Sequence, residues 1–260
     1  MTVLSRLGAA LFVVAIPLLL VTSNVRFFAG EVRFYERGFR EFNAGEATGL
    51  PLEELDRAAR EIINYFENDT ETLRILVAHE GQEESLFNSR ETQHMKDVKQ
   101  VMRIVYRINE ITLAYVLAYI VGVYIWAGER PLRSLARLSL LGVALGVVVI
   151  GAIGAFVVAG FDQAWTTFHE LLFRNDLWQL NPDTDRLIQM FPEPFWEETT
   201  YIIGIMTFAE ATAIVVLSTA YLLLSRQSTN AVGRKNEREP ERIEQLRPAP
   251  EPVSHPGSED

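Results

Sequence analysis

The sequence contains no cysteine. This absence excludes disulfide bonds, thiol nucleophiles and cysteine-ligated metals, and it leaves the redox compartment unassigned. The chain also lacks a G-x-S-x-G nucleophile elbow and an H-E-x-x-H zinc motif, so those two kinds of catalytic site are not indicated. No internal repeat is evident. What the 260 residues do contain is a net charge of −10 and apolar residues that are concentrated in four runs.

These four apolar runs predict membrane spans. A hydrocarbon core of about 30 Å requires a helix of about 20 mostly apolar residues. Three runs meet this requirement, at about 104–127, 138–160 and 200–224. The first run, about 7–22, is shorter and contains Pro17, so a cleaved signal peptide competes with an uncleaved span. We expect an uncleaved span, because no small-x-small cleavage site stands out after it.

The charge pattern predicts the orientation of the spans. The short loop 128–137 has a basic excess, which is typical of a cytoplasmic connection, from Arg130, Arg133 and Arg137. Both termini then lie in the cytoplasm, and segments 23–103 and 161–199 share the extracytoplasmic side. We therefore expect a multi-pass protein of the cell membrane, with any active site in these two segments.

The predicted fold is an α-helical integral membrane protein, with a four-span membrane domain over 1–225 and a small extracytoplasmic α(+β) segment between the first and second spans. Apolar residues at helical spacing predict an amphipathic helix over 52–66. The sequence leaves open whether 72–78 and 85–87 pair as a β-hairpin or form irregular chain. Residues 226–260 are rich in Glu, Arg, Pro and Ser, and this composition predicts a disordered cytoplasmic tail.

The first candidate site residue is His94, just before the second span. Asn88 followed by Glu91 has the form of a capping box, so we expect a helix to start there and run unbroken into the span. Helical periodicity puts His94 and Asp97 on one otherwise apolar face. There the carboxylate can orient the imidazole or raise its pKa. The alternative is a structural pair that satisfies buried backbone groups.

The opposite face of the same helix is basic, with Lys96, Lys99, Arg103 and Arg107. One interpretation is a solvated face that meets anionic lipid headgroups. The other is a clamp on a lipid-linked substrate. The sequence leaves both open.

The second candidate is His169, at the edge of an apolar stripe that predicts an interfacial helix over 161–172. The alternative is a snorkelling or capping histidine. A very polar run follows, which includes Arg174, Asn175 and Asp176. Its later part does not fit a calcium loop, because Arg186 stands where the loop needs glycine.

Within the predicted spans, Gly142 and Gly146 have the small-xxx-small spacing that permits close helix approach. Glu210 lies about midway along the fourth span, where a carboxylate is costly and is treated as functional by default. A protonated Glu210, or one paired with Arg107, would instead serve packing alone.

Histidines without a cysteine or serine motif favour acid–base chemistry, since an imidazole has an ordinary pKa of about 6.5. A divalent metal is the alternative, with a ligand set of His94, Asp97, His169 and Asp176. The spacing of this set matches no recognised motif, so we expect no metal and no cofactor.

Two motifs carry a resemblance to a known family. "HMKDVK" (94–99) before a span, and "FHELLFRNDLWQLNPDTDRLIQMFPEPFW" (168–196) between the last two spans, resemble the four-span bacterial family that includes the lipoprotein intramolecular transacylase Lit. The resemblance covers the order of spans from about 7 to 225 and leaves the tail unexplained.

The resemblance implies transfer of the sn-2 acyl chain of a diacylglyceryl-modified bacterial lipoprotein to its N-terminal α-amine. His94 and His169 match the two family histidines implicated in catalysis. The implied partners are such lipoproteins and membrane lipids, and no nucleic acid. Asp97 is the candidate to orient a histidine, and Arg174 or Asn175 to stabilise the oxyanion. The supporting residues expected are Asp97, Lys99, Arg174, Asn175, Asp176 and Glu210. A lipid or lipoprotein hydrolase, or a non-enzymatic envelope protein, are the alternatives.

Overall fold

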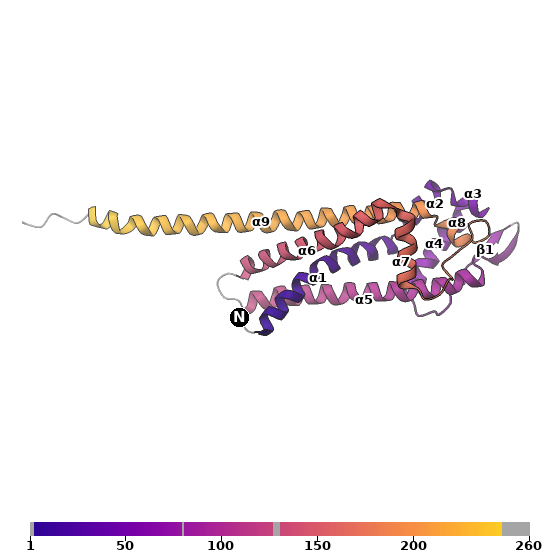
Figure 1. Cartoon of the computed structure of the whole chain (residues 1–260), viewed down its shortest axis with the longest axis horizontal. Helices are drawn as coiled ribbons and strands as arrows, with labels where there is room; N and C mark the ends of the chain where they lie inside the picture. Colours follow the sequence, from indigo (N-terminus) through magenta and orange to yellow (C-terminus); the bar gives the residue numbers. More distant parts are fainter. Residues whose placement is uncertain (1–2, 80, 127–130, 246–260) are drawn as a thin grey trace, which may run out of the picture.

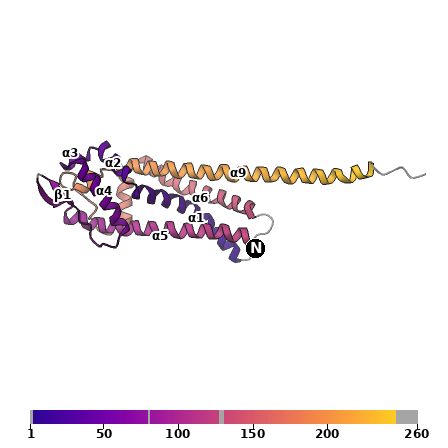
Figure 2. The ribbon, with the colours of Figure 1, turned by 180° about the vertical axis from the view of Figure 1, so that it is seen from behind.

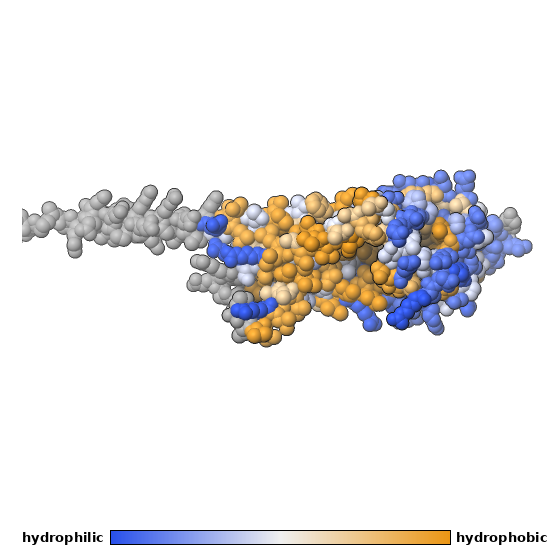
Figure 3. All heavy atoms as spheres, in the orientation of Figure 1, coloured by the Kyte–Doolittle hydropathy of each residue, from blue (hydrophilic) through white to orange (hydrophobic). Residues whose placement is uncertain are grey.

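Four long helices form the body of the protein. The computed structural model describes residues 3–79, 81–126 and 131–245. Within them the long helices lie side by side in both views of Figures 1 and 2, and they are α1 (Val3–Gly30), α5 (Ser89–Trp126), α6 (Pro131–Ala159) and α9 (Glu193–Gln245). Each is long and apolar enough to cross a membrane. Hydrophobic residues cover the visible face of this bundle (Figure 3). The predicted four-span fold is confirmed.

The remaining elements gather at one end of the bundle and form a largely hydrophilic cap (Figures 1 and 3). We use the name cap for residues 31–103 and 160–199. Its elements, besides the first turns of α5 and α9, are α2 (Val32–Glu41), α3 (Ala44–Thr48), α4 (Leu52–Glu67), β1 (Leu76–His79), β2 (Gln82–Ser85), α7 (Phe161–Leu172) and α8 (Arg186–Met190).

The cap confirms the amphipathic helix over 52–66, it contains a helix over 161–172, and of the two alternatives left open before α5 it has the hairpin. In the hairpin, β1 and β2 pair antiparallel with Leu76 opposite Ser85. The turn between them uses Gly81 at φ +80°, a conformation that only glycine adopts without a steric cost. Strand β1 is shorter than the predicted 72–78, and β2 lies at Gln82–Ser85, where the prediction had 85–87.

A single apolar core holds the two parts of the cap together. The buried face of α4 supplies Leu55, Ala59 and Ile62 at helical spacing. Phe191 and Phe195, from the second cap segment, join the same core. The segments that precede α5 and follow α6 therefore fold as one unit, which fixes their positions relative to each other.

Helix α5 extends well beyond the membrane layer. Its 38 residues span about 57 Å at about 1.5 Å per residue, against a hydrocarbon core of about 30 Å. The predicted capping box starts it: the Asn88 backbone N–H donates to Glu91 Oε2 at 2.7 Å, and the Glu91 N–H donates to Asn88 Oδ1 at 3.0 Å. The first four turns of α5 thus belong to the cap.

The glycines of α6 allow it to pack closely against α1. A Cβ atom at Gly142 would lie 2.9 Å from Ile16 Cβ, and one at Gly146 would lie 3.0 Å from Pro17 Cβ. Both distances are shorter than side chains tolerate. The predicted close approach at these two positions is confirmed.

Glu210 joins two helices inside the bundle. Asn24 of α1 donates a hydrogen bond from Nδ2 to Glu210 Oε2 at 2.9 Å, and the same nitrogen lies 3.2 Å from Thr207 Oγ1. The partner is therefore Asn24, in place of the expected Arg107. A carboxylate satisfied in this way supports the packing interpretation.

The boundary of the predicted tail differs in the structure. Helix α9 continues to Gln245, whereas we expected disorder from residue 226. The sequence after the span is rich in Glu, Arg and Lys, and these residues extend a helix that is already nucleated. Residues 246–260 and Arg130 lie outside the described residues. At the same end of the bundle, Arg133 Nη2 donates to the Ser225 carbonyl at 3.3 Å and joins α6 to α9.

Candidate active site

The cap brings the two candidate histidines together. His94 projects from the second turn of α5 and His169 from the last turns of α7, and their ring centroids are 6.1 Å apart. Each exposes only 6% of its surface. The pair therefore lies in a protected position at the end of the bundle that carries the cap.

Aromatic rings enclose His169. The Trp165 and Trp178 rings lie 4.4 Å and 4.9 Å from it, measured between centroids. Phe173 contacts both histidines, at 5.1 Å from His94 and 5.7 Å from His169. These rings exclude water from the imidazole, which strengthens every electrostatic interaction that it makes.

One backbone contact assigns the tautomer of His169. Its Nδ1 lies 2.8 Å from the carbonyl oxygen of Trp165. A carbonyl only accepts hydrogen bonds, so Nδ1 carries the hydrogen and Nε2 carries the lone pair of the neutral ring. Burial lowers the pKa of His169, and the bond to the carbonyl opposes this shift. His169 is thus ready to accept a proton at Nε2.

His94 is buried, and one of its two ring nitrogens makes no hydrogen bond within the described residues. Within the part of the chain that the structure describes, its Nδ1 has no hydrogen-bond partner. Burial, followed by the charge of a protonated His169, lowers the pKa of His94 to about 4, while Asp97 acts in the opposite direction. His94 is therefore neutral at physiological pH. Protonation of both histidines at the same time is unfavourable, because the two positive charges repel each other.

Acidification should cost the protein stability through His94. Its pKa is about 4 when folded and ordinarily 6.5, so the unfolded chain binds the extra proton between these values. The stability is present above pH 6.5 and is lost as pH falls towards 4, by about 2–3 kcal/mol at pH 4.5. We expect thermal unfolding in detergent to show a smaller loss between pH 7 and 4.5 for His94→Gln than for the parent.

The quantity to compare is the difference in stability loss between the parent and His94→Gln. Burial also raises the pKa of Glu91, and this makes the folded state more stable as the pH falls, opposite to the effect of His94. Both proteins contain Glu91, so its contribution cancels. An identical pH dependence for the two proteins would contradict the shifted pKa of His94.

The loop between α7 and α8 is fastened to the start of α5. Asn88 Nδ2 donates to Asp185 Oδ1 at 2.8 Å, and the Leu187 N–H donates to Glu91 Oε1 at 2.6 Å. Arg90 adds a bond to the backbone oxygen of Asp176. The sequence predicted Glu91 only as a capping residue, and it brought up Asp185 only with Asn181 and Asp183, as part of the rejected calcium loop. The acidic, turn-forming composition of 181–185 was the one signal of its structural role.

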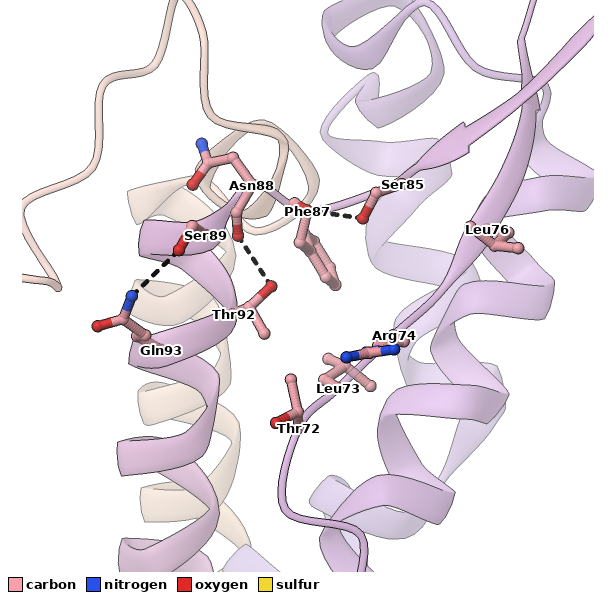
Figure 4. Close-up of a pocket in the computed structure, with 10 residues that line it drawn as sticks. All are labelled: Thr72, Leu73, Arg74, Leu76, Ser85, Phe87, Asn88, Ser89, Thr92 and Gln93. Carbon is pink, nitrogen blue, oxygen red and sulfur yellow. Dashed lines mark hydrogen bonds between the residues drawn. The ribbon is translucent and has the colours of Figure 1, made fainter.

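The first turn of α5 also borders a cavity of about 410 Å³ against β1 and β2. Figure 4 shows Asn88, Ser89 and Thr92 on one side of it and Arg74 on the other, with the side chains of Asn88 and Ser89 pointing away from Arg74. Neither histidine lines this cavity, so it is separate from the pair.

Several supporting residues have partners that differ from those expected. Asp97 accepts a hydrogen bond from Asn175 Nδ2 at 2.9 Å, so its direct contact is with the loop and its effect on His94 is electrostatic. Asn175 is thereby engaged as a positioning group. Arg174 is exposed and follows Phe173, beside the histidine pair.

Three side chains of the basic face of α5, Lys96, Lys99 and Arg103, bind protein within the cap. Lys99 donates to Asn68 Oδ1 at 3.1 Å and to the Thr70 oxygen at 2.6 Å. Arg103 and Lys96 bond the same 67–72 connection. Lys99 thus anchors the end of α4, and Glu210 lies in the bundle, so neither contacts the histidines.

In the part of the chain that the structure describes, the acidic and histidine side chains form no metal cluster. Among residues 3–79, 81–126 and 131–245, no three His, Asp or Glu side chains are grouped so as to hold a metal ion. The alternative ligand set of His94, Asp97, His169 and Asp176 is not assembled.

Fold and site together define a class: a multi-pass helical membrane protein with a buried histidine pair in a cap at one end. The chain belongs to the lipoprotein intramolecular transacylase Lit family, whose family model matches residues 10–196. That range includes both histidines and the loop between α7 and α9.

Solved structures show the same fold. The membrane-integral lipoprotein intramolecular transacylase Lit from Bacillus cereus superposes with a TM-score of 0.69 at 18% identity, over 86% of this chain and 98% of that one. A variant of it with one histidine replaced by arginine superposes at 0.67, with 18% identity, over 86% of this chain and 95% of that one.

A curated relative covers part of the chain. An uncharacterized protein of Aquifex aeolicus is 26% identical over 136 residues, or 52% of this chain and 57% of that protein. The chain thus spans somewhat more than half the length of this relative.

Proposed function

We propose that this protein moves the sn-2 acyl chain of a diacylglyceryl-modified lipoprotein to the α-amine of its N-terminal cysteine, with His94 and His169 as the catalytic residues. Family membership supports the reaction class. The observation that carries the proposal for this chain is the buried histidine pair, 6.1 Å apart, in which His94 Nδ1 has no protein partner within the described residues.

The unpartnered nitrogen argues against the structural alternative. A buried polar atom without a hydrogen bond costs about 1–3 kcal/mol, so structural histidines are normally satisfied. Such a cost is typical of sites where the missing partner is the substrate. The pair is also enclosed by Trp165, Phe173 and Trp178, which favours transfer to an amine over attack by water.

The proposed reaction needs one proton to move. The neutral amine nitrogen attacks the ester carbonyl and forms the new N–C bond, and its proton passes to Nε2 of His169. His169 then passes that proton on to His94, and as the C–O bond to glycerol breaks, the protonated His94 delivers it to the departing oxygen, because the low pKa of His94 makes its protonated form a strong acid. The two histidines together hold one extra proton at a time, and both rings are neutral again once the glycerol oxygen has taken that proton.

Much of the rate comes from holding amine and ester in one pocket. Effective molarities of intramolecular reactions reach about 10⁵–10⁸ M. Because both reacting groups belong to one lipoprotein, the site needs to exclude water and place the two groups. The loop that Asn88 and Glu91 fasten to α5 contributes by holding Trp178 beside His169.

We propose that the cap faces the extracytoplasmic side and that both chain ends lie in the cytoplasm. The argument is the basic excess near Arg133 and Arg137, at the opposite end of the bundle from the cap. The lipid-linked cysteine of a lipoprotein would then meet the histidines at headgroup level. Exposed apolar side chains of α7, such as Phe168 and Leu171, suit contact with membrane lipid there.

The test is mass spectrometry of the N-terminal peptide of a reporter lipoprotein, co-expressed with this chain in a bacterium unable to N-acylate lipoproteins. We expect a mass-neutral move of one acyl chain from glycerol to the amine. Loss of one acyl chain with a free amine would replace the proposal with a hydrolase. An unchanged diacylglyceryl peptide, with expression confirmed, would refute the activity.

A further inference from the structure

The Trp178 ring lies closer to parallel with the His169 ring than the other indole and phenyl rings around it do, and Phe173 comes next, at 41° and 5.7 Å. The two rings are only 30° from parallel at a centroid distance of 4.9 Å, so the indole presents its face to the imidazole. Trp165 and Phe168 meet the same imidazole edge to face, at 69° and 84°. The face of an indole carries negative charge density and attracts a cation within about 6 Å of its centroid.

We propose that Trp178 is a positioning residue whose indole face stabilises the protonated form of His169. The inference rests on the proposed function and deepens it. It assigns a residue that stabilises His169 while His169 holds the proton taken from the amine. A buried imidazolium loses its hydration, and the indole face and the Trp165 carbonyl together replace it.

The loop holds Trp178 in this position through contacts on both sides. Asn175 Oδ1 accepts from the Leu177 N–H at 3.1 Å, and its amide is fixed by Asp97. After Trp178, the Leu180 N–H donates to the Trp178 carbonyl at 2.9 Å. Asp97 therefore reaches His169 indirectly, through the loop that carries the indole.

The charged and titratable groups on the elements around His169 must stay constant in any test. They include Arg90, His94 and Asp97 on α5, Arg174 and Asp176 in the loop, Glu193 and Glu197 on α9, and Asp162 and Glu170 on α7 itself. A substitution at Trp178 changes none of these groups. A changed proton affinity of His169 would therefore report on the indole.

Two alternative roles for Trp178 predict opposite changes in the pKa of His169 when Trp178 is replaced. If the indole attracts the imidazolium, its removal lowers the pKa of His169. If it only shields the ring from water, its removal raises that pKa, because water stabilises the charged form. The sign of the change thus distinguishes a cation–π partner from a hydrophobic cover.

The experiment is a ¹³C NMR titration of the full chain in detergent micelles, labelled at the histidine ring carbons. The chain has four histidines, so each signal is assigned by replacing one histidine at a time. For Trp178→Leu we expect the pKa of His169 to fall by about half to one unit. Trp178→Phe, which keeps an aromatic face, should give a smaller fall.

Trp196→Leu is the matched control. Trp196 stacks on Trp165 at 5.3 Å and donates to the Phe191 carbonyl, and it belongs to the same aromatic cluster. The Trp196→Leu substitution should leave the pKa of His169 unchanged. A rise, or no change, in both Trp178 variants would overturn the inference, and Trp178→Phe alone decides it if Trp178→Leu does not fold.

This readout does not depend on acyl transfer. A fall in the pKa of His169 without any transacylation would uphold the role of Trp178 and refute the proposed reaction. Where the protein is active, the acidic limb of its pH–rate profile should move with the pKa of His169, in the same direction for each variant.

Discussion

His94→Ala and His169→Ala are each expected to lower acyl transfer to the reporter lipoprotein by about 10²–10⁴-fold. Each substitution removes one end of the proton relay, so the attack on the ester or the departure of glycerol loses its acid–base catalyst. Because the two rings act as one unit, the double variant should be little worse than the poorer single variant. The measurement is the rate of N-acylated peptide formation by mass spectrometry, at matched membrane expression.

His79→Ala is the matched control for these variants. His79 lies in the hairpin of the cap, where its Nδ1 is 3.0 Å from Glu84 Oε1, and it is partly exposed. The same substitution there should leave the rate unchanged. Full activity in both His94→Ala and His169→Ala would refute the catalytic assignment.

Glu91→Gln is expected to reduce both thermal stability and activity, through the loop and not through contact with substrate. Glu91 is 1% exposed and its two oxygens each accept a backbone N–H, from Asn88 and from Leu187. Glutamine keeps one acceptor and turns an NH₂ group towards the other N–H, so one buried donor loses its partner. That loss costs about 1–3 kcal/mol.

Unfolding followed by tryptophan fluorescence is the measurement for Glu91→Gln, because Trp165, Trp178 and Trp196 lie close to the loop. The effect on activity should appear in kcat more than in KM, since the loop holds Trp178 against His169. Glu84→Gln is the control: Glu84 also binds the loop, through Arg186, but at the exposed surface. If Glu91→Gln matches Glu84→Gln in both stability and rate, the loop attachment has no such role.

The local elements of the fold were predictable because they depend on neighbours in sequence. Span length, the capping box at Asn88, the amphipathic face of 52–66 and the interfacial stripe around His169 are patterns of a few turns. The short helices α2, α3 and α8 were missed. They belong to the shared core around Phe39 and Phe191, and α2 buries Tyr35, Gly38 and Phe39 at a helical spacing that the sequence analysis did not use.

Partner choice was less predictable for the polar residues. Lys99 had the helical position of a lipid-facing lysine, yet it binds the end of α4. Asp97 has the spacing to face His94, yet its hydrogen bond goes to Asn175. In both cases a side chain on a correctly predicted face meets a segment whose path the sequence does not specify.

The sequence by itself determined four spans, a cap made of two segments, and two histidines beside the membrane. Only the tertiary structure decided that His94 and His169 lie 6.1 Å apart, that His94 Nδ1 lacks a partner among the described residues, and that Trp178 faces His169. The reason is that periodicity reports which side of a helix is apolar, whereas contacts between distant segments depend on how the whole core packs.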